Sequence, residues 1–375
     1  MWENCASVLT RIEFSLVISR AATVADIDAF DEVIDVRSPC EFFEDHIPGA
    51  INLPVLDDAE RTRVGKLYKE VSSFEAKKVG AALVSRNIAH HLEGYFAAQP
   101  RSWRPLIYCW RGGSRSGSMS HVLQQVGFTA GQLEGGYKAY RRKVVADLSA
   151  LPTQLNFVVV SGPTGSGKSR LLQALAAQGG QVLDLEELAA HRGSLLGALP
   201  DQDQPNQKKF ESTIWSSFRR FNGVQPIFVE SESKKIGALR VPDALIDRMR
   251  ESACLRLEVS LPSRITLLIE EYKHFFSDPA SLQVQLSHLT RLRGHETIQA
   301  WLTMVESQDW PGLVEDLLCT HYDPAYFKSL NKNYASGIQD THYSLNDISL
   351  AGFSTLAAQV LAEVSADALT QPQNS

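Results

Sequence analysis

The chain has 375 residues, of which 44% are hydrophobic and 21% are charged, and its formal net charge is −6. Such values are typical of a soluble globular protein, and the length exceeds what one hydrophobic core usually organises, so we expect two domains. The acidic balance excludes a basic nucleic-acid coat protein and leaves nucleic-acid binding to a local basic surface. No apolar run approaches the roughly 18 residues that a membrane span needs.

The first half alternates short apolar runs with helical stretches, which predicts an α/β domain over residues 12–146. We expect buried strands at 33–36 and 106–108, each followed by a polar or glycine-rich loop. Residues 57–99 are charged, contain no proline and predict a helical insertion, because a simple crossover between parallel strands is much shorter. Residues 147–156 are a candidate linker.

The second half predicts another α/β domain over 155–262 and a helical C-terminal region over 263–370. We expect its strands at 157–160, 181–183, 226–229 and 255–259, and only helices from about residue 262 onward. Residues 370–375 (TQPQNS) are expected to be disordered. The first 20 residues mix acids and arginines with their apolar residues and predict no signal peptide.

The five cysteines are odd in number, scattered, and never spaced as a CxxC pair; they stand at positions 5, 40, 109, 254 and 319. The pattern predicts no structural metal site, no dithiol redox couple and no disulfide framework. It favours reduced thiols and a cytoplasmic location.

One cysteine has a reactive context. Cys109 follows an apolar strand, and the loop after it reads Trp110-Arg111-Gly112-Gly113-Ser114 before Arg115 and an apolar helical pattern. Such a loop points successive backbone N–H groups at the sulfur, at the start of a helix, and so stabilises a thiolate or a bound anion. Arg111 or Arg115 would further lower the thiol pKa, and Gly112 and Gly113 would allow the loop its conformation.

These residues resemble the rhodanese domain. Similar segments are Asp35-Val36-Arg37 with Glu41-Phe42, His46 to Asn52, and Leu133 to Tyr137. Asp45 departs from the family pattern, which commonly has glycine before the histidine. The resemblance implies that Cys109 carries a persulfide or its selenium equivalent. Certain phosphatases have a similar cysteine loop, but the six residues from Cys109 through Ser114 favour sulfur transfer, because the phosphatase loop usually runs one residue longer.

A complete phosphate-binding loop opens the second domain. The segment is Gly162-Pro163-Thr164-Gly165-Ser166-Gly167-Lys168-Ser169, between an apolar strand and an amphipathic helix. Its glycines let backbone N–H groups hold phosphate oxygens, Lys168 neutralises charge, and Ser169 is a candidate ligand of Mg²⁺. Any diphosphate has a shape that fits such a loop, so the motif does not by itself indicate ATP or GTP.

Several polar residues follow the strands of the second domain. Glu230 and Glu232 follow one strand, and Asp184 and Glu186 follow another, where nucleoside triphosphatases place a metal-binding carboxylate. Solvated loop positions are the alternative for either pair. His191 and Arg192 are candidates for reaching a bound phosphate.

The order of the two motifs resembles the tRNA 2-selenouridine synthase family. Further similar segments are Asp184 to Ser194, Val229 to Ser233 with Ile236-Gly237, Glu270-Glu271-Tyr272, and Tyr322 to Tyr326. The resemblance implies replacement of the sulfur of wobble 2-thiouridine by selenium from selenophosphate, through an S-geranyl intermediate made from geranyl diphosphate. Cys109 would receive or relay selenium, and an enzyme that produces selenophosphate is a candidate partner.

Transfer RNA would be the macromolecular substrate. Candidate contacts are the basic clusters Lys77-Lys78, Arg141-Arg142-Lys143, Lys208-Lys209, Arg219-Arg220 and Lys234-Lys235. Each cluster taken alone is more simply a solvated helix face. Trp110, Tyr137 and Tyr140 are candidates for stacking an extruded base, although core packing is expected for at least one of them.

Two other functions stay open from the residues alone. One is a P-loop nucleoside triphosphatase or kinase whose rhodanese-like domain only docks partners. The other is a general sulfurtransferase with an accessory nucleotide domain. An intact cysteine-to-arginine loop counts against the first, and the long helical C-terminal region counts against the second.

Overall fold

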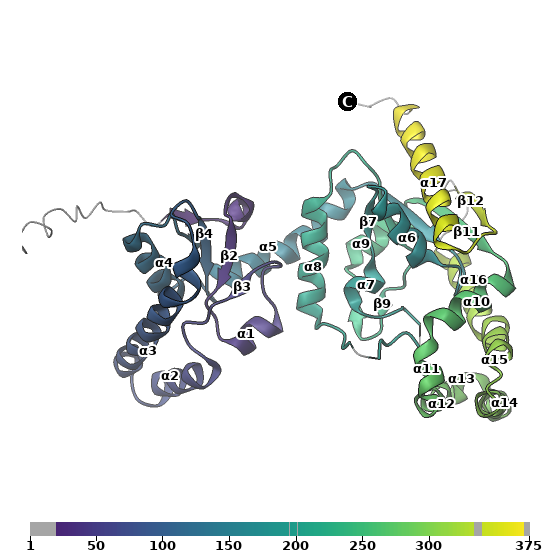
Figure 1. Cartoon of the computed structure of the whole chain (residues 1–375), viewed down its shortest axis with the longest axis horizontal. Coiled ribbons are helices and arrows are strands. Elements are labelled where there is room, and N and C mark those ends of the chain that lie inside the picture. The colour runs from purple at the N-terminus through teal and green to yellow at the C-terminus, as the bar shows by residue number, and fades with distance from the viewer. Residues whose placement is uncertain (1–19, 195, 201, 334–339, 371–375) are drawn as a thin grey trace, which may run out of the picture. The chain divides into compact units, whose positions relative to one another are not determined.

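The computed structural model describes residues 20–194, 196–200, 202–333 and 340–370, and divides the chain into two compact units at Val144/Val145 (Figure 1). The predicted strands and the α/β class are confirmed. Cys5, the first 19 residues and residues 371–375 lie outside the described residues, and so do the predictions that fall on them. Among the described residues, no helix is long and apolar enough to cross a membrane.

The N-terminal unit is built on a five-stranded parallel sheet in the order β1-β5-β4-β2-β3. Its strands are β1 (Arg20–Ala22), β2 (Glu32–Asp35), β3 (Ile51–Asn52), β4 (Pro105–Tyr108) and β5 (Gly131–Leu133). All four residues of β4 are buried, because this central strand has neighbours on both sides and helices above and below it. The short strands β1, β3 and β5 were not predicted.

Helices connect and cover this sheet. They are α1 (Pro39–Glu44), α2 (Asp58–Glu70), α3 (Ser73–Glu93), α4 (Ser114–Val126) and α5 (Gly136–Ala150), with 3₁₀ turns η1 (Val24–Ala29) and η2 (Tyr95–Ala98). The predicted insertion is the pair α2 and α3, each begun by a side chain that accepts a hydrogen bond from the third residue of the helix, Asp57 and Ser72 respectively. The predicted linker at 147–156 is wrong, because α5 continues through Ala150 and the 3₁₀ turn η3 (Leu151–Gln154) follows directly.

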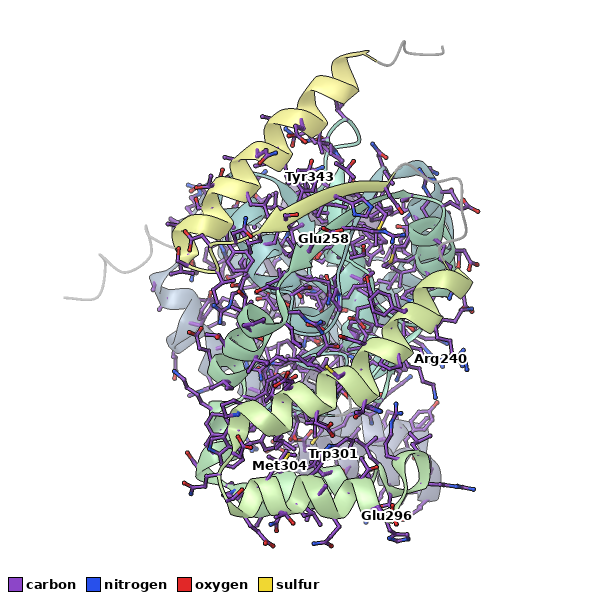
Figure 2. The ribbon with its side chains drawn as sticks, turned by 90° about the vertical axis from the view of Figure 1, so that its right-hand side faces the viewer. Arg240, Glu258, Glu296, Trp301, Met304 and Tyr343 are labelled. Atoms are coloured by element: carbon purple, nitrogen blue, oxygen red, sulfur yellow. The ribbon has the colours of Figure 1, made fainter. Side chains whose placement is uncertain are left out.

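The second unit has a five-stranded parallel sheet in the order β12-β11-β6-β8-β7. The strands are β6 (Phe157–Ser161), β7 (Gln181–Leu183), β8 (Ile227–Glu230), β11 (Ala253–Val259) and β12 (Asp340–Leu345), and β9 (Lys235–Ile236) with β10 (Leu239–Arg240) forms a small antiparallel ribbon. The expectation of helices alone after residue 262 is therefore wrong. Strand β12 pairs with β11 along its length, and Figure 2 shows Tyr343 of β12 close to Glu258 of β11.

Helices follow the strands of this unit and then form a separate group. Those around the sheet are α6 (Lys168–Ala177), α7 (Leu185–Ala189), α8 (Gln207–Arg220), α9 (Asp243–Arg250) and α17 (Leu350–Thr370). The group after β11 is α10 (Leu261–Glu271), α11 (Lys273–Ser277), α12 (Pro279–Ser287), α13 (Thr290–Arg293), α14 (His295–Glu306), α15 (Trp310–Leu317), the π turn η4 (Leu318–Tyr322) and α16 (Asp323–Asn333). Trp301 of α14, labelled in Figure 2, is fully buried at its centre and donates its indole N–H to Asp316.

The final helix α17 belongs to the core of the sheet. Its residues Phe353, Leu356, Ala357 and Val360 are buried in one cluster with Leu171 and other side chains of α6. The ring of Phe353 lies so close to Gly167 that a Cβ at Gly167 would overlap it. The C-terminal residues therefore support the phosphate-binding loop directly.

We predict that Phe353→Ala lowers the free energy of unfolding of this unit by about 3–5 kcal/mol, because a fully buried ring is lost from a packed core. The control is Phe327→Ala on α16, where 52% of the side chain is exposed and the expected change is within about 0.5 kcal/mol. Hydrogen exchange of the β6 and β11 amides in the full chain measures this free energy for the unit alone. Equal effects of the two substitutions would contradict the packing role of α17.

Candidate functional site

The first candidate site is the loop between β4 and α4. Cys109 leaves the carboxyl end of β4 and is 4% exposed. Gly112 has a φ of +64°, and a Cβ there would lie 2.6 Å from the carbonyl oxygen of Leu133, so this position requires glycine. Gly113 has a negative φ and open space around it, so the predicted need for glycine there is wrong.

Hydrogen bonds lower the pKa of the Cys109 thiol more than neighbouring charges do. The Ser116 hydroxyl lies 3.2 Å from Cys109 Sγ, in the first turn of α4. Burial raises the pKa of the Cys109 thiol, but hydrogen bonds from the Ser116 hydroxyl and from the backbone N–H groups of Ser116 and Arg111 outweigh burial, and the net pKa is lowered. The Arg111 side chain itself is exposed, and so are Gly113 and Ser114.

Arg115 lowers the pKa of Cys109 less than the sequence suggested. Its guanidinium forms two hydrogen bonds with Glu41, one of 2.6 Å from Nη1 to Oε2 and one of 3.2 Å from Nη2 to Oε1. Burial raises the pKa of Glu41, but its hydrogen-bond and charge partners, first of all Arg115, together lower it by more. The net pKa is lowered, so the carboxylate is ionised and balances the arginine charge. The Arg115 charge is accordingly the smallest of the influences that lower the Cys109 pKa.

Two of the segments that resemble the rhodanese domain, Asp35 to Arg37 and Leu133 to Tyr137, contribute to a buried network around Arg37. Arg37 is 1% exposed, donates to Asp35 and to the Asp45 carbonyl, and its Cζ lies 4.2 Å from the centre of the Tyr137 ring. Asp45 Oδ2 accepts a 2.7 Å hydrogen bond from the Tyr137 hydroxyl. Asp45, which departs from the family pattern, is thus a buried structural acceptor.

The segment before α5 closes the loop from the other side. The backbone N–H of Tyr137 donates to the Cys109 carbonyl at 2.8 Å, and a Cβ at Gly136 would overlap that carbonyl. Tyr137 and Tyr140 are fully buried, which gives both of them a core role. Trp110 is half-buried and stacks on Tyr137 with 5.2 Å between ring centres, so of the three rings it is the one that is partly exposed.

The second candidate site is the phosphate-binding loop, which lies between β6 and α6. Gly165 and Gly167 have φ values of +79° and +78°, and Lys168 Nζ donates to the Gly162 carbonyl at 3.0 Å. The loop forms one wall of a cavity of about 730 Å³ that is also lined by Asp184, Glu186, His191, Arg192 and Glu232. The structure therefore brings the predicted second-domain residues together, except Glu230, which lies buried beside them.

Four carboxyl groups meet at one side of this cavity. Ser169 Oγ lies 3.3 Å from Glu186 Oε2, and the Glu186 backbone N–H donates to Glu230 at 2.7 Å. Burial, and then the Glu232 charge, raise the pKa of Glu186 to about 8, and burial raises the pKa of Asp184 to about 6. Burial also raises the pKa values of Glu230 and Glu232. At neutral pH this cluster therefore carries protons.

His191 and Arg192 shape the cavity wall. His191 Nδ1 accepts a 3.1 Å hydrogen bond from the Gly193 N–H, and burial lowers the His191 pKa, so its ring is neutral at neutral pH. Arg192 donates to the Glu271 carbonyl, and its Cζ lies 4.7 Å from the centre of the Tyr272 ring. Its guanidinium keeps further N–H donors for a ligand in the cavity.

Two residues that position these sites, Ser116 and Arg264, were not predicted from the sequence. Ser116 could have been found from its place in the first turn of a helix, where side chains point back toward the helix start. Arg264 is a lone cation on the apolar face of α10, which is a signal for a buried, fully paired charge. Its Nε donates to the Thr164 carbonyl at 2.8 Å, and both of its terminal nitrogens donate to Asp323.

The predicted basic clusters are divided between the units. Lys77-Lys78 on α3 and Arg141-Arg142-Lys143 on α5 belong to the N-terminal unit, and the other three clusters belong to the second unit. Lys208-Lys209 and Arg219-Arg220 stand at opposite ends of the same helix, α8. Lys78 pairs with Glu75, and Lys234 pairs with Asp243.

Comparisons with known proteins agree with this arrangement. A family model described as the tRNA 2-selenouridine synthase AAA domain matches residues 155–344, and a rhodanese-like domain model matches residues 21–143. A tRNA 2-selenouridine synthase of Marinobacter nauticus is 34% identical over 326 residues, which are 78% of this chain and 87% of that protein.

Other relatives match over a shorter part. Proteins of the same name from Nitrosomonas europaea and Bdellovibrio bacteriovorus are 34% and 35% identical, each over 64% of this chain. The chain spans 63% and 64% of the length of these two relatives.

We predict that Ser116→Ala raises the pKa of Cys109 and slows its alkylation at pH 7 about tenfold, because a hydrogen bond to an ionised group contributes about 1.5–3 kcal/mol. Iodoacetamide labelling followed by peptide mass spectrometry separates Cys109 from the exposed Cys40 and Cys319. The control is Ser118→Ala, an exposed serine on the same helix. An unchanged labelling rate in Ser116→Ala would assign the low pKa to the backbone N–H groups alone.

The carboxyl cluster predicts a pH-dependent stability. A carboxyl whose pKa is raised on folding stabilises the folded state below its ordinary pKa, and this contribution is lost as pH rises toward the folded value, about 8 for Glu186. Glu186→Gln, which keeps the neutral shape, should therefore match wild type near pH 4.5 and become increasingly more stable than wild type up to about pH 8. The control is Glu187→Gln, an exposed carboxylate on the same helix, and thermal unfolding across pH is the measurement. A pH-independent difference would contradict the protonated state of Glu186.

Proposed function

The chain belongs to the tRNA 2-selenouridine synthase family, and we propose that it replaces the sulfur of wobble 2-thiouridine in tRNA by selenium. The observation that carries this proposal is the pairing in one chain of a thiol of lowered pKa and a phosphate-binding cavity. Neither site alone indicates a substrate. Together they provide one place for a chalcogen anion and another for a phosphate-bearing co-substrate.

The phosphate-binding loop is proposed to hold the diphosphate of geranyl diphosphate. The N–H groups of the loop and Lys168 would bind the phosphate oxygens. Ser169 and Glu186 would be the protein ligands of a Mg²⁺ ion, because the Ser169 hydroxyl and a Glu186 carboxylate oxygen are 3.3 Å apart. Mg²⁺ commonly takes one or two protein oxygens and completes its shell with substrate phosphate and water, so a cluster of three acidic ligands is not required.

The alkylation step would use this arrangement directly. The sulfur of 2-thiouridine attacks the first carbon of the geranyl chain, the carbon–oxygen bond breaks, and diphosphate leaves with the electron pair. The uridine N3 proton passes to solvent. Lys168 and the loop N–H groups would stabilise the charge that develops on the leaving diphosphate.

Alkylation makes the sulfur a good leaving group for the second step. The selenium of selenophosphate would attack C2 of the base and displace geranyl thiolate, and water would then cleave the selenium–phosphorus bond and release phosphate. Cys109 is proposed to act at this selenium step. The Ser116 hydroxyl and the loop N–H groups, which stabilise the Cys109 thiolate, would stabilise the anionic selenium donor bound beside it. An enzyme that produces selenophosphate is the partner this chemistry needs.

Transfer RNA is proposed to contact the exposed basic residues. Lys208 and Arg220 at the two ends of α8 are exposed and suited to phosphate contacts. Trp110 is the aromatic candidate for stacking an extruded base, because Tyr137 and Tyr140 are buried.

The test is mass spectrometry of nucleosides from 2-thiouridine tRNA incubated with the protein, geranyl diphosphate and selenophosphate. We expect 2-selenouridine with wild type, accumulation of the geranylated nucleoside with Cys109→Ser, and neither product with Lys168→Ala. The control is Cys319→Ser, which changes an exposed cysteine of the other unit and should leave both products unchanged. An unmodified tRNA with wild type would contradict the proposal and favour a nucleoside triphosphatase with a docking module, whereas full 2-selenouridine formation by Cys109→Ser would contradict the proposed role of Cys109.

A further inference from the structure

A second cavity lies among the helices that follow β11. It has a volume of about 60 Å³, several times the roughly 10–15 Å³ that one water molecule needs. Hydrocarbon and aromatic groups form almost all of its wall, from residues that include Phe275, Phe276, Leu282, Trp310, Leu313 and Leu317. A cavity of this composition favours an apolar ligand group, because a polar group inside it would lose its hydrogen bonds to water without gaining others.

This apolar cavity adjoins the phosphate-binding cavity. Thr164 of the phosphate-binding loop, Ser194, Leu268, Tyr272 and Tyr322 line both of them. A ligand whose phosphates rest on the loop therefore has an apolar space directly beside its head group. The combination fits a molecule with a charged head and a hydrocarbon tail.

A nucleotide fits the same space poorly. Its base would leave several donors and acceptors unpaired against leucine and phenylalanine side chains, and each unpaired group costs binding free energy. The polar groups at the junction, Ser194 Oγ and the Tyr272 hydroxyl, lie 3.5 Å apart and face each other. The Arg192 guanidinium covers the Tyr272 ring, which places the positive charge on the side of the phosphate-binding cavity.

Two aromatic rings form a part of the apolar cavity wall that is not shared with the phosphate-binding cavity. Phe276 of α11 and Trp310 of α15 stack with 4.6 Å between ring centres and 25° between planes, and neither lines the phosphate-binding cavity. Val314, one turn after Trp310, also faces the apolar cavity and is only half-buried. These residues limit how long a tail the cavity can accept.

We propose that the apolar cavity binds the hydrocarbon tail of a short-chain prenyl diphosphate, and that Phe276, Trp310 and Val314 select its length. This inference rests on the proposed function, because it concerns the co-substrate of the same phosphate-binding loop. It goes further by assigning the tail to the helices α10, α11, α12 and α15 and the selection of chain length to three named side chains.

The test is calorimetric titration of the full chain with geranyl diphosphate, farnesyl diphosphate, inorganic diphosphate and ADP. We expect wild type to bind geranyl diphosphate at least about tenfold more tightly than inorganic diphosphate, which burial of about two methylene groups suffices to give. Val314→Phe, which fills the cavity, should abolish this difference and leave the affinity for inorganic diphosphate unchanged. Trp310→Ala, which enlarges the cavity by removing a lining ring, should improve farnesyl diphosphate binding relative to geranyl diphosphate.

Leu292→Phe is the matched control, since it adds the same ring at a position that is 72% exposed on α13 and should change no affinity. An unchanged affinity for inorganic diphosphate shows that a variant is folded at the loop. Equal binding of geranyl and inorganic diphosphate by wild type would overturn the inference, as would an ADP affinity that falls in Val314→Phe. Tail-dependent binding without tRNA modification would refute the proposed function and leave this inference standing, whereas modification without tail-dependent binding would refute this inference alone.

Discussion

The buried guanidinium of Arg264 is the constraint on which the second unit depends. Burying a charge costs several kcal/mol unless every donor finds a partner, and Arg264 finds them in the Thr164 carbonyl and the Asp323 carboxylate. These contacts join the phosphate-binding loop to α10 and α16, three segments far apart in sequence. Because Thr164 lines both cavities, the arginine also fixes the point where they meet. The helical group thus forms part of the wall of the phosphate-binding cavity.

The phosphate-binding cavity contains groups that attract an anion and groups that repel one. Lys168 and the loop N–H groups attract an anion, while Asp184, Glu186, Glu230 and Glu232 would repel one if they were all ionised. Burial resolves the conflict by raising the pKa values of these carboxyl groups, so that protons reduce the repulsion at neutral pH. A divalent cation beside Ser169 would replace the proton on Glu186. The affinity of this cavity for a diphosphate should accordingly depend on pH and on the cation together.

The sequence predicted those features that arise within a few residues. The strand 181–183, the phosphate-binding loop and the cysteine loop follow from local apolar patterns and glycine positions, and the structure has all three. It did not predict β12, whose buried residues are only Tyr343 and Leu345, because an edge strand has a weak alternating pattern and gains its partner from β11, about 85 residues earlier. Residues 147–150, the last turn of α5, were taken for part of a linker because this turn contains polar residues.

The two candidate sites share one local structure, although each suits a different kind of anion. In each, a loop with glycine at positive φ leads into a helix whose first turn supplies a serine hydroxyl, Ser116 toward Cys109 and Ser169 toward Glu186. The difference lies in what surrounds the loop. At Cys109 the Glu41 carboxylate is paired with Arg115, and the sulfur is buried, which suits an anion that stays covalently attached. At the phosphate-binding loop a wide cavity with proton-bearing carboxyl groups suits an anion that must arrive and leave. Under the proposed function the chain would hold one anion and exchange another, and the two units provide these two different environments.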